Sequence, residues 1–142
     1  MIRELQSAER SSTAMRGLVW LAAELPDEAI TAIITDELPG LTTLGLFGEQ
    51  EPQELIGFVS FDASREPVEI EYIAVGAAAQ HGGHGSRLIE AVRDHVGGAT
   101  LYAQTDDDAV DFYRKRGFTI TSAAPDPRWP ERQRYDCALT SA

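Results

Sequence analysis

Polar and hydrophobic positions alternate in several short segments of the chain, and this period of two is typical of β-strands. Residues 68–75 (VEIEYIAV) show the alternation most clearly. Residues 41–47 and 54–61 are also apolar and β-prone, and the polar segment 48–53 between them predicts an antiparallel hairpin. Four further short strands are expected at residues 2–5, 100–104, 118–120 and 133–139.

Two helices are predicted between the first strand and the hairpin. Ser11 and Ser12 offer N-cap hydroxyls for the first helix, which should end before Pro26. Asp27, directly after that proline, suits the first turn of the second helix, whose apolar residues keep helical spacing as far as Leu38.

Two more helices are predicted in the second half. One starts near Gly85, carries an apolar stripe and ends at Gly97–Gly98. Residues 105–108 (TDDD) resemble a capping box that opens the other helix, and Gly117 ends it. The predicted order is β-α-α-β-β-β-α-β-α-β-β, which is an α/β fold, and 142 residues suit a single domain with one core.

A glycine-rich loop joins the strand at 68–75 to the helix near Gly85. Glycines let backbone N–H groups turn toward a ligand, and a helix start adds unpaired donors, so this order predicts a phosphate site. Two common nucleotide motifs do not fit. A Walker loop has Lys followed by Ser or Thr after its last glycine, where this chain has Ser86–Arg87, and the dinucleotide fingerprint needs a glycine in place of Leu88.

Two other motifs fit a known family. Gln80, Gly83 and Gly85 form the pattern Q-x-x-G-x-G, and residues 106–118 form D-x-x-A-x-x-F-Y-x-x-x-G-F. Together they resemble the GNAT superfamily of acetyl-CoA-dependent N-acyltransferases. The resemblance implies one N-acetyltransferase domain over residues 1–142, with a mixed sheet of six to seven strands whose two central parallel strands splay apart.

The resemblance also implies an acetyl-CoA site. Backbone groups of Ile73, Ala74 and Val75 would bond the pantetheine arm in the gap between the splayed strands. Family members usually carry basic residues between the glutamine and the first glycine; this loop has neither Lys nor Arg there, and Arg87 is the residue that could compensate. The candidates for holding the diphosphate are Gln80, His81, Gly82, Gly83, His84, Gly85, Ser86 and Arg87.

Two carboxylates and one phenol are the candidates for acid–base catalysis. By the period of two, Glu69 and Glu71 should share one strand face with Ile73 and Val75, and their proximity would raise one pKa and make a better base. Glu69 stands where histone-type members of the family carry their glutamate base, so it is favoured narrowly over Glu71. Tyr113 stands where the family places the tyrosine that protonates the CoA sulfur, and a backbone amide near Val75 would hold the oxyanion.

These residues also have structural interpretations. Both carboxylates could face water or pair with arginines such as Arg132 or Arg134. Periodicity alone favours a core position for Tyr113. Trp129 and Tyr135 could wall the acceptor pocket or simply pack as aromatic residues.

The net charge of −11 is unevenly distributed. Residues 1–80 carry four basic and fourteen acidic side chains, giving −10, whereas residues 81–142 carry eight and nine, giving −1. A nucleic-acid partner is therefore not expected. Because early helices and late loops largely build the acceptor side of this fold, the acidic excess predicts a cationic amine acceptor such as a polyamine, a lysine-like side chain or an aminoglycoside. Solubility is the competing explanation.

Other features limit the class of protein. No apolar run approaches the roughly 20 residues of a membrane span, and residues 1–10 lack a signal-peptide centre, so a cytoplasmic protein without a membrane partner is expected. Cys137, the single cysteine, cannot form an internal disulfide and is expected in the core. His81 and His84 lack further ligands at fitting spacing, so no metal is expected. A homodimer is left open, as is a CoA-binding sensor without turnover.

Overall fold

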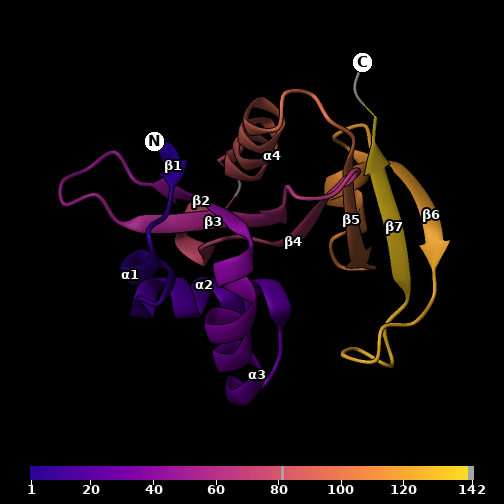
Figure 1. Ribbon diagram of the computed structural model, residues 1–142, viewed down its shortest axis with the longest axis horizontal. Coiled ribbons are helices and arrows are strands. Elements are labelled where there is room, and N and C mark those ends of the chain that lie inside the picture. Colours follow the sequence, from indigo (N-terminus) through magenta and orange to yellow (C-terminus); the bar gives the residue numbers. More distant parts are fainter. Residues whose placement is uncertain (81, 141–142) are drawn as a thin grey trace.

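The computed structural model describes residues 1–80 and 82–140, and its centre is a mixed sheet of seven strands with helices on both faces (Figure 1). The order across the sheet is β1-β2-β3-β4-β5-β7-β6. The predicted α/β class and the sheet of six to seven strands are confirmed. The strands are β1 (Ile2–Glu4), β2 (Thr42–Phe47), β3 (Leu55–Asp62), β4 (Val68–Val75), β5 (Leu101–Asp106), β6 (Thr119–Ala123) and β7 (Arg134–Leu139).

The helices follow the predicted order, with one short addition, α1, before the first predicted helix. Ser12 caps α2 as predicted, since its hydroxyl accepts the Met15 N–H at 3.2 Å. The α-helices are α1 (Ser7–Arg10), α2 (Thr13–Ala23), α3 (Asp27–Ala32), α4 (His84–His95) and α5 (Val110–Arg114). A π-helical turn, η1 (Ile33–Glu37), and a 3₁₀ turn, η2 (Leu38–Gly40), extend α3, and a second 3₁₀ turn, η3 (Ala77–Ala79), follows β4.

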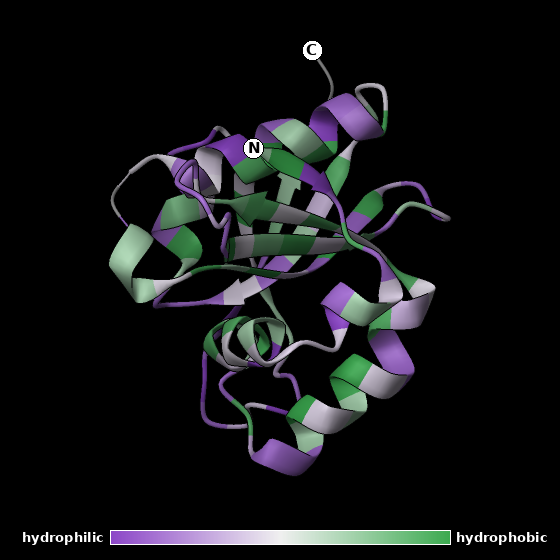
Figure 2. Cartoon of the chain, turned by 90° about the vertical axis from the view of Figure 1, so that its left-hand side faces the viewer, coloured by the Kyte–Doolittle hydropathy of each residue, from purple (hydrophilic) through white to green (hydrophobic). Residues whose placement is uncertain are grey.

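Two apolar layers hold the helices against the sheet. One contains Leu88 and Val92 of α4 with Tyr113 of α5, and the other contains Met15 of α2 and Ile30 of α3. Figure 2 shows the sheet between helices above and below it. None of the helices in the described residues combines the length and the apolar character that a membrane span requires.

The parallel strands β4 and β5 separate after three residue pairs. Residues 68–70 pair with residues 101–103, and no further pairing joins the two strands within the described chain. β5 nevertheless stays paired with β7 as far as Asp106. The predicted splay of the central parallel strands is confirmed, and it leaves the β5-facing backbone groups of residues 71–75 without a partner strand.

A β-bulge interrupts β4 at its middle. Tyr72 pairs with Ser60 of β3, and the next pair is Ile70 with Phe61, so Glu71 has no direct partner. Bulges reorient side chains and often lie beside active sites.

The expectation that Glu69, Glu71, Ile73 and Val75 share one face is therefore wrong. The extra residue shifts the period of two, so Glu69 faces the α2 side together with Tyr72, whereas Ile73 and Val75 face the α4 side. Polar and apolar residues alternate from Val68 to Tyr72, on both sides of the bulge, so this pattern could not reveal it.

The start of α5 also differs from the prediction. β5 continues to Asp106, and the helix begins only at Val110, after an N-cap residue, Ala109, that makes no side-chain capping bond. The Asp106 carboxylate instead accepts the Asp108 N–H at 3.0 Å in a tight turn. The capping box predicted at residues 105–108 is wrong, because its first two residues still belong to the strand.

Candidate active site

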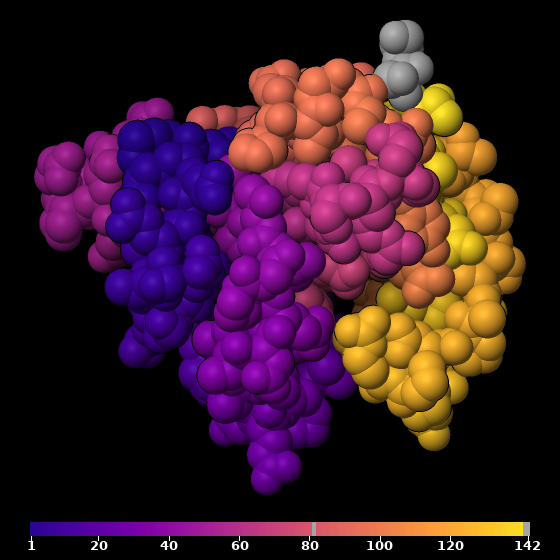
Figure 3. All heavy atoms as spheres, in the orientation of Figure 1, coloured from indigo at the N-terminus to yellow at the C-terminus, as the bar shows by residue number. Residues whose placement is uncertain are grey.

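A cleft of about 660 Å³ opens where β4 and β5 diverge. Its walls are β4, the end of α2, the first turn of α4, α5 and the loop of residues 124–133. Figure 3 shows a hollow between the violet N-terminal helices and the gold residues of that loop. A concave site of this size is typical of small-molecule binding.

The splayed half of β4 forms one wall of the cleft. Ile73, Ala74 and Val75, which the sequence predicted to bond a pantetheine arm, all line it. Gln80 also lines the cleft, and its Nε2 donates to the Val75 carbonyl oxygen at 3.0 Å. Gln80 thus ties the glycine loop back to the end of β4.

The first turn of α4 forms a second wall. Gly83 is its N-cap and has a φ of +75°, a left-handed conformation that glycine adopts without strain. The Arg87 N–H bonds the Gly83 carbonyl at 3.2 Å, so the amides before Arg87 have no partner within the helix. Gly83, His84 and Gly85 line the cleft, and this arrangement suits a phosphate.

The remaining loop candidates lie slightly farther away. Gly82 is exposed, and Ser86 and Arg87 belong to the first turn of α4 without lining the cleft. Arg87 Nη1 lies 3.4 Å from His84 Nδ1, which places a positive charge beside the helix start. His81 lies outside the described residues.

Gly85 also allows α5 to approach α4 closely. A Cβ at Gly85 would lie 2.5 Å from Phe112 Cε1, closer than non-bonded carbon atoms approach. The Phe112 ring in turn carries the Arg116 guanidinium, whose Cζ is 3.8 Å from the ring centroid. Gly85, the last glycine of the Q-x-x-G-x-G motif, therefore allows the close contact that positions α5, which contains part of the second motif.

Tyr113 is both packed in the core and present at the cleft. Its side chain is 4% exposed, lines the cleft, and meets Phe112 and Phe118 edge to face at centroid distances of 5.1 and 5.2 Å. Burial is the main factor that raises the pKa of its hydroxyl. The phenol therefore holds its proton at neutral pH and can donate it.

Glu69 and Glu71 both line the cleft but have different surroundings. Glu69 accepts a hydrogen bond from Arg65 at 3.1 Å. Glu71 is half-buried, and its pKa is raised by burial first and by the negative charge of Glu69 second, while Arg128 opposes the shift. A raised pKa makes a carboxylate a better proton acceptor, so Glu71 has a property that a general base requires.

The loop of residues 124–133 covers the cleft from the side of α2. Trp129 Nε1 donates to the Ala23 carbonyl at 2.8 Å, which fixes the indole against the end of α2. Arg128 binds Asp126 through Nε at 3.2 Å and Nη2 at 2.9 Å. Trp129 and Arg128 both line the cleft, so the interpretation of Trp129 as a wall fits its position.

Tyr135 does not share that position, because its hydroxyl donates to Asp107 and its side chain is not part of the cleft wall. Besides Tyr113, Tyr72 lines the cleft; its hydroxyl donates to Glu37 at 2.7 Å and lies 3.4 Å from Arg128 Nη1. Sequence analysis missed Tyr72, since an aromatic residue in a central strand is most simply a core residue.

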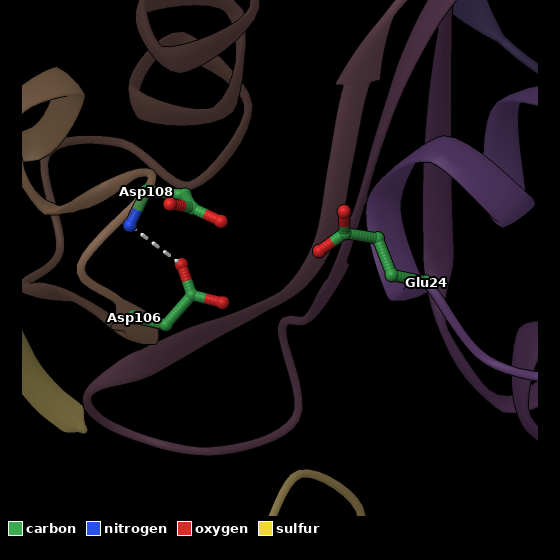
Figure 4. Close-up of side chains that lie close together, drawn as sticks. All are labelled: Glu24, Asp106 and Asp108. Atoms are coloured by element: carbon green, nitrogen blue, oxygen red, sulfur yellow. Dashed lines mark hydrogen bonds between the residues drawn. The ribbon is translucent and has the colours of Figure 1, made fainter. Parts of the chain in front are cut away.

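Three carboxylates gather at the mouth of the cleft. Figure 4 shows Glu24, Asp106 and Asp108, which offer oxygen atoms within 4.8 Å of one another. Arg132 Nη1 lies 2.7 Å from oxygens of Glu24 and Asp106 and 3.7 Å from Asp108, where a cation would otherwise sit. The group is an ion-pair network that joins the loop to α2 and β5. The alternative in which Arg132 pairs with the carboxylates of β4 is therefore wrong.

Two arginines at the cleft carry an Nε that is buried without a hydrogen-bond partner, Arg116 and Arg134. Sequence analysis assigned neither to the site. In the sequence, Arg116 lies in a run of three cations at the end of a predicted helix, and Arg134 is indicated only as a possible partner of Glu69 or Glu71. No local pattern marks either residue, because the cleft that they line is assembled from distant segments.

Residues 44–120, more than half of the chain, match the family described as acetyltransferase (GNAT) domain. The chain belongs to the GNAT acetyltransferase family. The match spans the splayed strands, the glycine loop and α5, so it confirms both the resemblance and the class of enzyme, an acyltransferase. Among curated proteins, none matches the sequence.

Solved GNAT structures share the fold. A GNAT family acetyltransferase from Elizabethkingia anophelis with acetyl-CoA bound has a TM-score of 0.71 and 20% identity, over 100% of this chain and 97% of that one. The aminoglycoside 6'-N-acetyltransferase from Enterococcus faecium has a TM-score of 0.70 and 18% identity, over 99% and 96%. An aminoglycoside 6'-N-acetyltransferase complexed with coenzyme A gives 0.70 and 20%, also over 99% and 96%.

Proposed function

We propose that this chain transfers an acetyl group from acetyl-CoA to a primary amine by direct attack of the amine on the thioester. The observation that carries the proposal is the splay of β4 from β5 beside a cleft that includes the first turn of α4. The similar structure from E. anophelis was solved with acetyl-CoA bound, which supports acetyl-CoA as the donor.

The cleft offers groups that match the parts of this donor. Backbone groups of residues 73–75 that face away from β3, other than the Val75 carbonyl that Gln80 engages, can bond the amides of the pantetheine arm. The unpaired amides at the start of α4, from His84 to Ser86, can bind the diphosphate without a metal ion. Arg87 and Arg116 supply positive charge on the two sides of this helix start, in place of basic residues in the loop.

The proposed chemistry needs a base and an acid. Glu71 takes one proton from the acceptor ammonium, the nitrogen lone pair attacks the carbonyl carbon, the C–S bond breaks, and the nitrogen releases its second proton to solvent to give the amide. Tyr113 gives its proton to the departing sulfur and regains one from solvent. A backbone N–H near Val75 stabilises the oxyanion. Glu69, which is held by Arg65, is the second candidate for the base.

A cationic acceptor is the proposed substrate class. Glu24, Glu69 and Glu71, all from the acidic first half of the chain, line the cleft. Acidic walls attract a polyamine, a lysine-like side chain or an N-terminal amine. Two of the similar structures are aminoglycoside 6'-N-acetyltransferases, and aminoglycosides carry several amino groups.

The proposal is tested by measuring CoA release from acetyl-CoA across a panel of polyamines, neutral amines and anionic amino acids. Cationic amines should turn over fastest. Tyr113→Phe keeps the ring and removes the proton, so it should lower kcat about 10²-fold or more while calorimetry shows unchanged CoA binding. A preference for anionic acceptors would contradict the cationic class. CoA binding by a wild type that acetylates no amine would support a CoA-binding sensor instead.

A further inference from the structure

Arg134 is a buried guanidinium without a carboxylate partner. Its side chain is 6% exposed and lines the cleft, and its Nε is sealed from water with no hydrogen bond. Within residues 1–80 and 82–140 it forms no ion pair, and its Cζ lies 4.7 Å from the centroid of the Trp129 ring. An unpaired buried charge is unfavourable, so a partner supplied by a ligand would stabilise it.

The acidic groups nearest in the fold are already engaged. Asp106 lies opposite Arg134 in the β5–β7 ladder, but its carboxylate binds Arg132 at 2.7 Å. Asp126 is held by two nitrogens of Arg128. Within the described chain, Arg134 is thus a cation of this wall that has no carboxylate in ion-pair contact.

Arg134 belongs to the face of the sheet that carries Glu69. Glu69 lies opposite Tyr102 of β5, and Arg134 lies opposite Asp106 of the same strand. Tyr102 and Asp106 are separated by an even number of residues, so all four side chains project from one face. This is the α2 face, whereas α5 with Tyr113 packs on the other. Arg134 therefore stands on the side from which the acceptor would approach.

We propose that Arg134 binds a carboxylate of the acceptor, so that the substrate is a cationic amine that also carries a carboxylate, as a free diamino acid does. This rests on the proposed transfer to an amine. The amine is directed to Glu71, and the carboxylate pairs with Arg134 beside Trp129. A planar guanidinium matches a carboxylate with two parallel hydrogen bonds. A polyamine would instead bring a second ammonium toward an uncompensated positive charge.

Matched pairs of acceptors test this site. Each pair contains an amino acid and the amine that differs from it only by lacking the carboxylate. The pairs are lysine and cadaverine, ornithine and putrescine, and phenylalanine and phenethylamine. In at least one pair the wild type should prefer the amino acid by about tenfold or more in kcat/KM, since a buried polar group left unpaired discriminates strongly. Arg134→Met should bring that ratio close to one, and Arg134→Lys should restore part of it.

Two controls separate recognition from folding. Arg93→Met makes the same change on α4, where Arg93 pairs with Glu90 outside the cleft, and should keep the wild-type ratio. Arg134→Met removes an unpaired buried charge, so its melting temperature should not fall below that of the wild type, and CoA binding should persist.

The outcomes distinguish this inference from the proposed function. Equal turnover within every pair, or an unchanged ratio in Arg134→Met, overturns the carboxylate site and leaves amine acetylation intact. If no amine turns over, the proposed function fails, and calorimetry of the CoA-loaded protein decides the carboxylate site separately. Lysine should then bind the wild type and not Arg134→Met, and absence of lysine binding overturns the inference.

Discussion

Glu71 lies at the bulge inside β4, where Ile70 and Tyr72 on either side of it pair with β3 and Glu71 does not, and the bulge brings a carboxylate of a central strand to the cleft. A half-buried carboxylate without an arginine in hydrogen-bond contact is unfavourable for stability, and the same surroundings raise its pKa. Glu69, two residues earlier, forms an ion pair with Arg65.

We expect Glu71→Gln to lower kcat about 10²- to 10⁴-fold, the usual contribution of a general base, and Glu69→Gln to lower it much less. In the wild type, kcat/KM should rise with pH through a pKa above the ordinary glutamate value, and Glu71→Gln should lose this rise. A pH–rate profile of both variants against the wild type measures it. An equal or larger loss in Glu69→Gln would assign the base to Glu69.

Stability provides an independent check on Glu71. Because its pKa is raised in the folded protein, the folded state binds more protons than the unfolded state between the ordinary and the raised pKa, and the free energy of unfolding falls as pH rises through this window. The neutral Glu71→Gln side chain removes this loss. Thermal unfolding at pH 5 and pH 8 should thus show a variant that is inactive yet at least as stable as the wild type at pH 8.

At the scale of elements, the contact between α4 and α5 couples the donor loop to the proton donor. Gly85 in the first turn of α4 meets the ring of Phe112, and Tyr113 follows directly on α5. The two sequence motifs therefore form one packed unit.

Gly85→Ala should force the Phe112 ring away from its position and weaken both stability and CoA binding. Overpacking of this kind costs about 1–3 kcal/mol, which a thermal melt and CoA calorimetry would record. Gly17→Ala on α2 is the matched control, because its Cβ meets nothing within 4 Å and a helix-interior alanine should raise stability by about 0.5–1 kcal/mol. A Gly85→Ala protein with lower CoA affinity and an unchanged melting temperature would show that the glycine acts only on the ligand.

The sequence predicted those elements that are defined by a local pattern and do not depend on pairing with another strand. β4 has the predicted bounds, and α2 starts after Ser12 as expected, because alternation and capping are local signals. The bulge at Glu71 depends on pairing with β3, and the end of β5 at Asp106 depends on pairing with β7, so neither is visible in the strand itself. The loop glycines and Tyr113 could be selected from motif spacing.

Arg134 could not be selected in that way, because its proposed role follows from its burial without an ion-pair partner in the described chain rather than from a motif. The whole molecule is needed to see this. The loop of residues 124–133 reaches back to the end of α2, more than a hundred positions earlier in the chain, through Trp129 to Ala23 and through Arg132 to Glu24. The cleft therefore has walls from both ends of the sequence. The ion pairs of Arg132 with Glu24 and Asp106 join the loop of residues 124–133 to α2 and β5.

Arg132→Met should weaken the attachment of this loop to α2 without unfolding the protein. The pairs of Arg132 are partly exposed, so their loss should lower the global free energy of unfolding by less than about 1 kcal/mol. Locally, however, the loop would lose its ion pairs with Glu24 and Asp106, which join it to α2 and β5, so it should move away from α2 more easily. We expect faster proteolysis within residues 124–133 and a several-fold higher KM for the acceptor, with CoA affinity unchanged. Arg16→Met, which removes a surface pair with Asp27, is the control and should change neither. A parallel rise in KM for acetyl-CoA would show that the ion pairs of Arg132 support the whole cleft rather than its acceptor side.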